Sequence, residues 1–238
     1  MTQGELHVMT FTKSTCVRLC SCVVAAAMAA SPLNAVTQPA PAFTSATAAP
    51  KAPDPEGFLQ RWLLLEPIVK PNRTNIGFTR IYVREALTAP YFSDQFGPVP
   101  KNGQVETVAG TPLTWHAMDS SLFDVKLFDF ARDLGKPTYG VIFWAVTVVD
   151  SPREMTNVRL AVGSNSASMW WVNGKEAAGL FGDRRMVMDD VLSPPLTLRK
   201  GRNIVRGAVI NGPGLSDFCV RFLDANGQPV RGIALTTR

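Results

Sequence analysis

Cysteine is scarce in this chain of 238 residues, and its distribution excludes a disulfide framework. Three of the four cysteines, Cys16, Cys20 and Cys22, lie close to the N-terminus, and Cys219 stands alone after them. A fold held by disulfides needs several cysteines that can pair within its folded part. Because Cys219 lies inside a short apolar run, we expect it to be a buried structural thiol.

Histidine is also scarce, which limits the catalytic and metal chemistry open to the chain. Of its two histidines, His116 is the one beyond the first 35 residues. A zinc or copper site needs several His or Cys ligands, so none is predicted. A Ser-His-Asp triad would have to use His116, and the chain has no Gly-x-Ser-x-Gly or Gly-Asp-Ser motif for the nucleophile. A hydrolytic site around His116 and the following Asp119-Ser120-Ser121 stays an alternative.

Charge is sparse and evenly spread. Charged residues make up 18% of the chain, the net charge is +5, and basic residues gather only in short pairs such as Arg184-Arg185 and Arg199-Lys200. Nucleic-acid binding needs a concentrated basic stripe, so no nucleic-acid partner is predicted. The hydrophobic content of 46% is enough for a sizeable core.

The first 35 residues have the pattern of a secretory signal peptide. Lys13 and Arg18 precede an apolar run over residues 19–30, and small residues follow up to Ala35. The run is too short to span a membrane comfortably. We therefore expect a secreted or periplasmic protein with no membrane contact once the signal is removed, and Met9 is an alternative start.

A change of composition follows the predicted signal peptide. Residues 36–55 are rich in Ala, Pro, Thr and Ser and have no hydrophobic period. This composition predicts a flexible, disordered linker. A single folded domain is then expected over residues 56–238.

Short β-rich runs separated by Gly, Pro and Asn dominate this domain. Residues 139–149 and 203–210 are expected to be buried central strands, and residues 81–87 one or two helical turns. Asn173-Gly174 closes an apolar run in the way that favours a type I′ hairpin turn. Alternation along that run places Trp170 and Trp171 on opposite faces. The pattern predicts an all-β fold of the sandwich or jelly-roll kind.

Several segments together carry a family resemblance. They are Trp-Leu-Leu-Leu at residues 62–65, GSNSASMWWVNGK at 163–175, Asp189-Asp190, Leu-Arg-Lys-Gly-Arg-Asn at 198–203 and Arg-Phe-Leu-Asp at 221–224. Over residues 58 to about 230 the chain resembles the galactose-binding-like jelly-roll accessory domains of bacterial acetyl xylan esterases and other secreted carbohydrate-active enzymes. The resemblance implies an all-β jelly-roll β-sandwich that binds carbohydrate. Where such families often carry Asp-Asp-Gly, this chain has Asn165-Ser166-Ala167.

Aromatic and basic side chains are the candidate ligand-binding residues. Sugar sites combine flat aromatic faces with polar groups that bind hydroxyls. Trp171 is expected on an exposed or groove-lining face, with Trp170 in the core. Asn165 and the Arg184-Arg185 pair are the candidate polar contacts. No cofactor is predicted, although Asp189-Asp190 has the oxygen ligands that calcium would accept.

Three functions follow from these observations. The first is non-catalytic binding of a plant or microbial polysaccharide, alone or beside a carbohydrate-active enzyme. The second is an acetyl xylan esterase or related carbohydrate hydrolase. The third is a structural domain that contacts a partner protein. His116 discriminates the first two, because binding does not need a general base.

Overall fold

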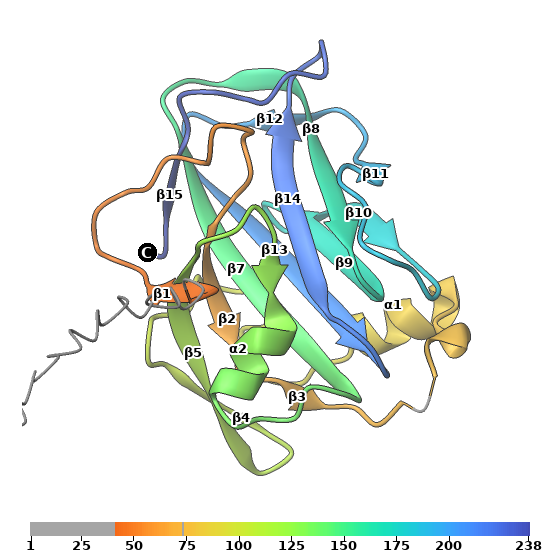
Figure 1. Ribbon diagram of the computed structural model, residues 1–238. Coiled ribbons are helices and arrows are strands. Elements are labelled where there is room, and N and C mark those ends of the chain that lie inside the picture. Colours follow the sequence, from red (N-terminus) through yellow and green to blue (C-terminus); the bar gives the residue numbers. More distant parts are fainter. Residues whose placement is uncertain (1–40, 73) are drawn as a thin grey trace, which may run out of the picture. The chain divides into compact units, whose positions relative to one another are not determined.

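The computed structural model describes residues 41–72 and 74–238, and these residues belong to one compact unit (Figure 1). The predicted signal peptide, residues 1–35, lies outside the described residues, as do residues 36–40 of the predicted linker. Among the described residues, no helix combines the length and the apolar character that crossing a bilayer requires.

Two antiparallel sheets make up most of the described chain. The larger sheet follows the strand order β1 (Phe43–Ser45), β5 (Thr111–Ser120), β2 (Arg61–Leu65), β7 (Val141–Ser151), β13 (Gly201–Asn211), β9 (Ala167–Val172) and β10 (Lys175–Leu180). Three short strands join it at its sides, with β4 (Val105–Val108) on β5 and both β3 (Ile68–Val69) and β15 (Ala234–Thr236) on β7.

The smaller sheet has the order β11 (Val191–Leu192), β8 (Met155–Ser164), β14 (Asp217–Leu223) and β6 (Val125–Lys126), with β12 (Leu196–Leu198) also paired to β8. Helical structure is limited to α1 (Arg80–Thr88), α2 (Leu127–Asp133) and the 3-10 turn η1 (Asn75–Gly77) in the part of the chain that the structure describes. The expected all-β sandwich class is therefore confirmed at the level of two antiparallel sheets.

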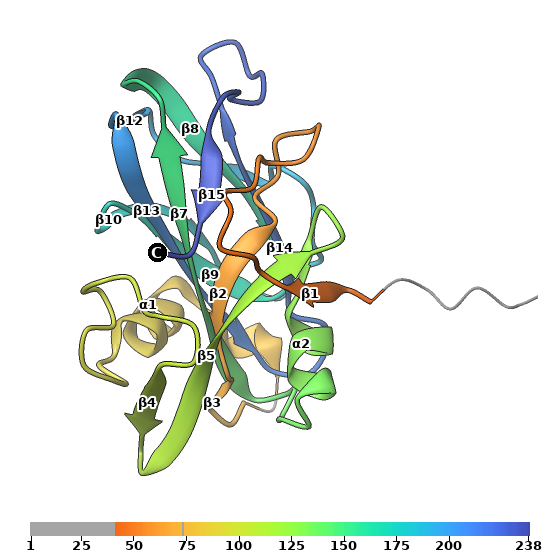
Figure 2. The same ribbon diagram turned by 90° about the vertical axis from the view of Figure 1, so that its left-hand side faces the viewer.

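The larger sheet is buried on both faces. One hydrophobic core lies between the sheets and includes Trp62 and Trp170, whereas a second core on the outer face includes Trp144 and Trp171. In Figure 2, α1 lies on one side of the large sheet, and β14 and α2 lie on the other. Because neighbouring side chains of a strand point to opposite faces, adjacent residues of β2 and β9 enter different cores.

Residues 89–104 help to cover the outer face, and Arg206 of β13 fastens them to the sheet. Its guanidinium donates hydrogen bonds to the carbonyls of Gly97 and Pro98. Burial lowers the pKa of Arg206 from its usual value, since the charged form loses hydration. Phe96, in the same segment, contacts the Trp171 ring edge-on with 5.1 Å between centroids.

Most local expectations are confirmed. The runs expected as central strands form β7 and β13, which pair over their whole length, and the expected helical turns lie in α1. Asn173 and Gly174 both adopt positive φ values, 51° and 78°, as a type I′ turn requires. The prediction that Trp170 and Trp171 occupy opposite faces is confirmed by their separate cores.

The expectation of a flexible, disordered linker is wrong for residues 41–55. Residues 43–45 form β1, paired with β5, and Lys51 forms an antiparallel bridge with Leu235. The Phe43 ring packs edge-on against Phe130, 6.1 Å between centroids. Arg61 also donates a hydrogen bond to the carbonyl of Ala49. Composition does not predict the structure of this segment, because contacts with strands distant in the sequence order it and its own residues have no apolar pattern.

Candidate functional site

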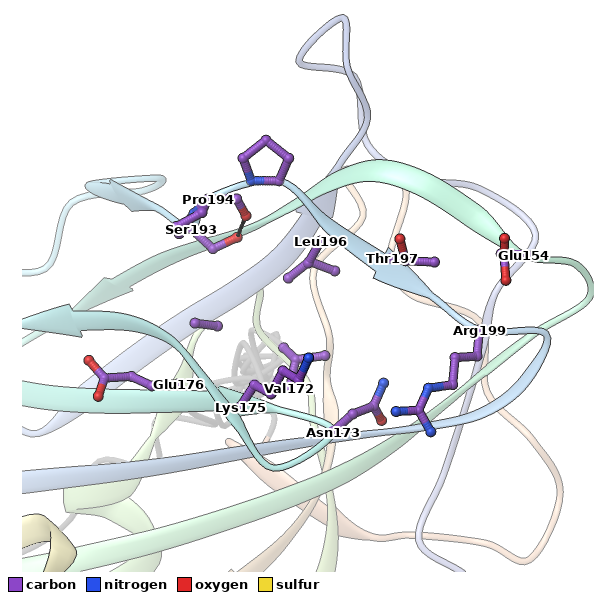
Figure 3. A pocket seen from close by; sticks show the side chains of 12 residues that line it. Glu154, Val172, Asn173, Lys175, Glu176, Ser193, Pro194, Leu196, Thr197 and Arg199 are labelled. Atoms are coloured by element: carbon purple, nitrogen blue, oxygen red, sulfur yellow. Dashed lines mark hydrogen bonds between the residues drawn. The ribbon is translucent and has the colours of Figure 1, made fainter.

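The main candidate site is a cleft of about 630 Å³ between β10 of the larger sheet and β12 of the smaller sheet (Figure 3). Its volume lies in the range of small-ligand sites, which is roughly 300–1,000 Å³. The lining residues come from both sheets and the turns beside them: Glu154, Val172, Asn173, Lys175, Glu176, Ala177, Ser193, Pro194, Pro195, Leu196, Thr197 and Arg199.

The β9–β10 hairpin forms one side of this cleft, and hydrogen bonds hold its turn to the start of β13. The Asn173 side chain accepts a hydrogen bond from the backbone N–H of Ile204 (2.9 Å) and donates one to Asn203 Oδ1 (3.0 Å). The same Asn203 oxygen accepts the backbone N–H of Arg199 (2.9 Å). These hydrogen bonds hold the backbone of Arg199 in place, so its side chain extends into the cleft from a fixed backbone position.

The charged side chains of the cleft differ in whether they already have a partner. Glu176 is held by Arg84 of α1 in a bidentate ion pair, with oxygen–nitrogen distances of 2.5 and 2.7 Å. Lys175, Arg199 and Glu154 are exposed and form no ion pair with any described residue. The cleft therefore offers two unpaired cations and one unpaired carboxylate to a ligand.

Apolar groups complete the lining. Val172, Ala177 and Leu196 border the interior core, and Pro194 and Pro195 stand at the surface. No aromatic ring is among the described lining residues. A ligand in this cleft would contact both aliphatic C–H surface and hydrogen-bonding groups, which suits a molecule with many hydroxyls on a compact carbon frame.

Trp171 does not lie in this cleft, and the expectation of an exposed or groove-lining ring is wrong. It is 6% exposed and stacks on Trp144 with 5.7 Å between ring centroids and 13° between planes. The reason is that α1 and residues 89–104 cover the face of β9 to which it points. Neither face of the larger sheet is exposed to solvent at β9. The alternation of side chains along the strand cannot predict this, because the covering segments are distant in the sequence.

Asn165 and Arg184 do lie together, at the turn between β8 and β9. Asn165 Oδ1 accepts the backbone N–H of Met186 (2.8 Å), and the Ser166 N–H bonds to the carbonyl of Arg184 (3.3 Å). Arg185 is exposed in the same loop. Their part in ligand binding stays a prediction, because these contacts hold the loop in place and do not themselves form a cavity.

Asp189 and Asp190 each bind an arginine. Arg221 contacts both carboxylate oxygens of Asp189, and Arg184 forms an ion pair with Asp190. In the described part of the chain, no group of His, Cys, Asp and Glu side chains is arranged to hold a metal ion. The two aspartates thus serve to anchor the loop over residues 183–190.

His116 has structural partners. Its ring nitrogen lies 3.3 Å from Glu66 Oε1, and its ring meets Phe130 edge-on. Burial alone would raise the pKa of Glu66, but hydrogen bonds from Lys136 and His116 outweigh it and hold that pKa below its usual value. Among the described residues no serine or threonine hydroxyl hydrogen-bonds to His116. The arrangement is an ion-pair cluster at the edge of the interior core.

Cys219 is buried and free, as expected. Burial raises the pKa of its thiol to about 12, since a thiolate there would lose its hydration. The thiol is therefore neutral at physiological pH and packs as a small apolar group.

A second groove, of about 480 Å³, lies where residues 46–48 pass the loop over residues 99–102. Lys101, Arg202 and Arg238 are the cations in its lining, and all three are exposed. Substitutions of the cations in this groove can serve as controls for substitutions of the cations in the cleft between β10 and β12.

Comparison with known proteins adds little to this geometry. No family model matches the chain, and no curated protein matches it. It is similar to the solved structure of a PA14 sugar-binding domain from an RTX adhesin, at 13% identity and a TM-score of 0.39, covering 72% of this chain and 94% of that one. The PA14 domain of the antifreeze protein MpAFP is similar at 11% identity and a TM-score of 0.39, covering 77% and 88% of the two chains. Scores this low leave the fold to be described from its own strands.

Proposed function

We propose that this chain is a secreted, non-catalytic carbohydrate-binding domain that holds a polysaccharide in the cleft between β10 and β12. The observation that carries the proposal is that one cleft contains both charged side chains without an internal partner and aliphatic side chains. Lys175 and Arg199 supply donors, Glu154 supplies acceptors, and the exposed prolines supply C–H contacts.

Sugar hydroxyls match this set of groups. Each hydroxyl both donates and accepts a hydrogen bond, so it can use a carboxylate and a cation in the same site. The short β9–β10 turn and the Asn173–Asn203 bonds pre-organise the hairpin side of the cleft, which reduces the ordering cost of binding. The same proposal covers the fold type and the location of the protein. The domain is a galactose-binding-like jelly roll that is exported to the periplasm or beyond, and it acts alone or beside a carbohydrate-active enzyme.

Affinity electrophoresis against a panel of plant and microbial polysaccharides tests the function. The parent should be retarded by at least one polymer. The Lys175→Ala/Arg199→Ala variant should lose about tenfold or more in affinity, because hydrogen bonds from charged donors are each worth roughly 1.5–3 kcal/mol. Lys101→Ala/Arg202→Ala removes the same charge from the second groove and should bind as the parent does.

Two results would overturn the proposal. One is equal retardation of the cleft variant and the parent by every polymer. The other is acetyl-ester hydrolysis that is present in the parent and abolished by His116→Ala, because a general base is worth roughly 100- to 10,000-fold in rate.

A further inference from the structure

The charge left over in the cleft after internal pairing is positive. Arg84 neutralises Glu176 from outside the cleft, and both side chains lie at the molecular surface. Lys175 and Arg199 have no carboxylate partner among the described residues, and Glu154 alone opposes them. A ligand that fills this cleft therefore meets one more free cation than free anion.

The two cations come from different elements, and both line the cleft. Lys175 begins β10, whereas Arg199 follows β12, and in Figure 3 the Arg199 guanidinium extends toward Asn173 beside the β9–β10 turn. Glu154 precedes β8 and stands on the side of the smaller sheet. One part of the cleft thus suits an anion, and the part near Glu154 suits hydroxyl donors.

We propose that the ligand is an acidic polysaccharide whose uronate carboxylate binds between Lys175 and Arg199, while ring hydroxyls donate to Glu154. This inference rests on the carbohydrate-binding function proposed above. A guanidinium presents parallel N–H donors that match the two oxygens of a carboxylate, and the ammonium adds a second charge-assisted bond.

An acidic polysaccharide fits better than an acidic polypeptide or a nucleic acid. Both of those polymers carry few free hydroxyls, the groups that can donate to Glu154 and also accept from a cation. A nucleic acid also needs a row of cations to replace its counterions, and this cleft has two. A uronate residue brings one carboxylate together with several hydroxyls.

The test compares each acidic polymer with its own carboxyl-reduced product. Polygalacturonate, alginate and glucuronoxylan, before and after reduction, are titrated into the full chain at low salt, with poly-L-glutamate as a separate arm. The parent should prefer the acidic form of at least one polymer by about tenfold. Arg199→Gln should remove most of this preference, and Glu154→Gln should increase it, because it removes the opposing charge. Lys101→Gln/Arg202→Gln should leave it unchanged.

The possible outcomes distinguish a failure of the uronate inference from a failure of the proposed carbohydrate-binding function. Equal binding of acidic and reduced polymers, weakened by the cleft variants, overturns the uronate inference and leaves carbohydrate binding intact. Binding of none of the six polysaccharides overturns both. A preference that follows Lys101 and Arg202 instead of Arg199 overturns the assignment to this cleft, and poly-L-glutamate binding at least as tightly as the polyuronates overturns the choice of polymer.

Discussion

At the residue scale, the tryptophans of this fold are packing residues. Trp171 and Trp144 stack on each other on the outer face of the larger sheet, and Trp62 and Trp170 meet edge-on in the core between the sheets, 6.0 Å between centroids. A buried indole removes a large apolar area from water and gains further energy from ring contacts. Their main contribution is therefore to the free energy of unfolding.

Replacement of Trp171 tests this directly. Trp171→Ala should lower the free energy of unfolding by about 3–5 kcal/mol, because it leaves a cavity against Trp144 and Phe96. Urea denaturation followed by fluorescence or circular dichroism measures the change. Ile76→Ala, at a side chain 83% exposed, should change it by less than about 0.5 kcal/mol. A Trp171→Ala protein as stable as the parent would show that the ring is not in the core.

At the scale of elements, two asparagine amides join three strands and the turns between them. Asn203 is fully buried, and its Nδ2 donates to the carbonyls of Arg199 (2.8 Å), Gly201 (3.0 Å) and Val149 (3.3 Å). Asn173 links this amide to the β9–β10 hairpin. The Trp-Val-Asn-Gly and Lys-Gly-x-Asn segments, distant in sequence, are thus a single structural unit beside the cleft.

Loss of the Asn203 amide should be costly. Asn203→Ala leaves buried N–H and C=O groups without partners, and each such group costs about 1–3 kcal/mol. We expect the free energy of unfolding to fall by about 2–4 kcal/mol in chemical denaturation. Asn226→Ala, in an exposed turn, serves as the control and should be close to neutral. Equal stability of the two variants would contradict the role assigned to Asn203.

Some elements of this fold can be predicted from the sequence alone, and others cannot. The Asn173-Gly174 turn was predictable because its signal is local, and β7 and β13 because their apolar runs are long. The short strand β1 and helix α2 were not, since Phe43 and Phe130 are ordered by contacts with each other and with distant strands. The cleft was missed for a similar reason: Lys175 and Arg199 give no motif, and only the approach of β10 to β12 brings them together.

At the scale of the whole described unit, residues 41–55 belong to the sandwich. They add β1 to one edge of the larger sheet, and Lys51 pairs with Leu235 in β15 near the other end of the chain. Arg61 connects them further, because it binds both Asp119 (2.8 Å) and the carbonyl of Ala49. The folded domain therefore begins before Phe43, earlier than composition predicts.

Limited proteolysis and truncation test this boundary. The stable product of proteolysis should begin upstream of Phe43, and a chain cut back to Glu56 should unfold at a lower temperature, since it loses the β1 pairing and the Phe43 contact with Phe130. N-terminal sequencing and calorimetry supply the two readouts. A protease-resistant core that starts at Glu56 with the thermal stability of the longer chain would contradict this account.

Chemical-shift mapping of the amide spectrum on addition of a bound oligosaccharide shows where on the domain the ligand binds. The largest shifts should fall on the non-proline lining residues of the cleft between β10 and β12 that lie within residues 172–177 and 193–199. Shifts concentrated instead on Asn165 and residues 184–190, or in the second groove near Lys101, with the cleft undisturbed, would contradict the assignment of ligand binding to this cleft.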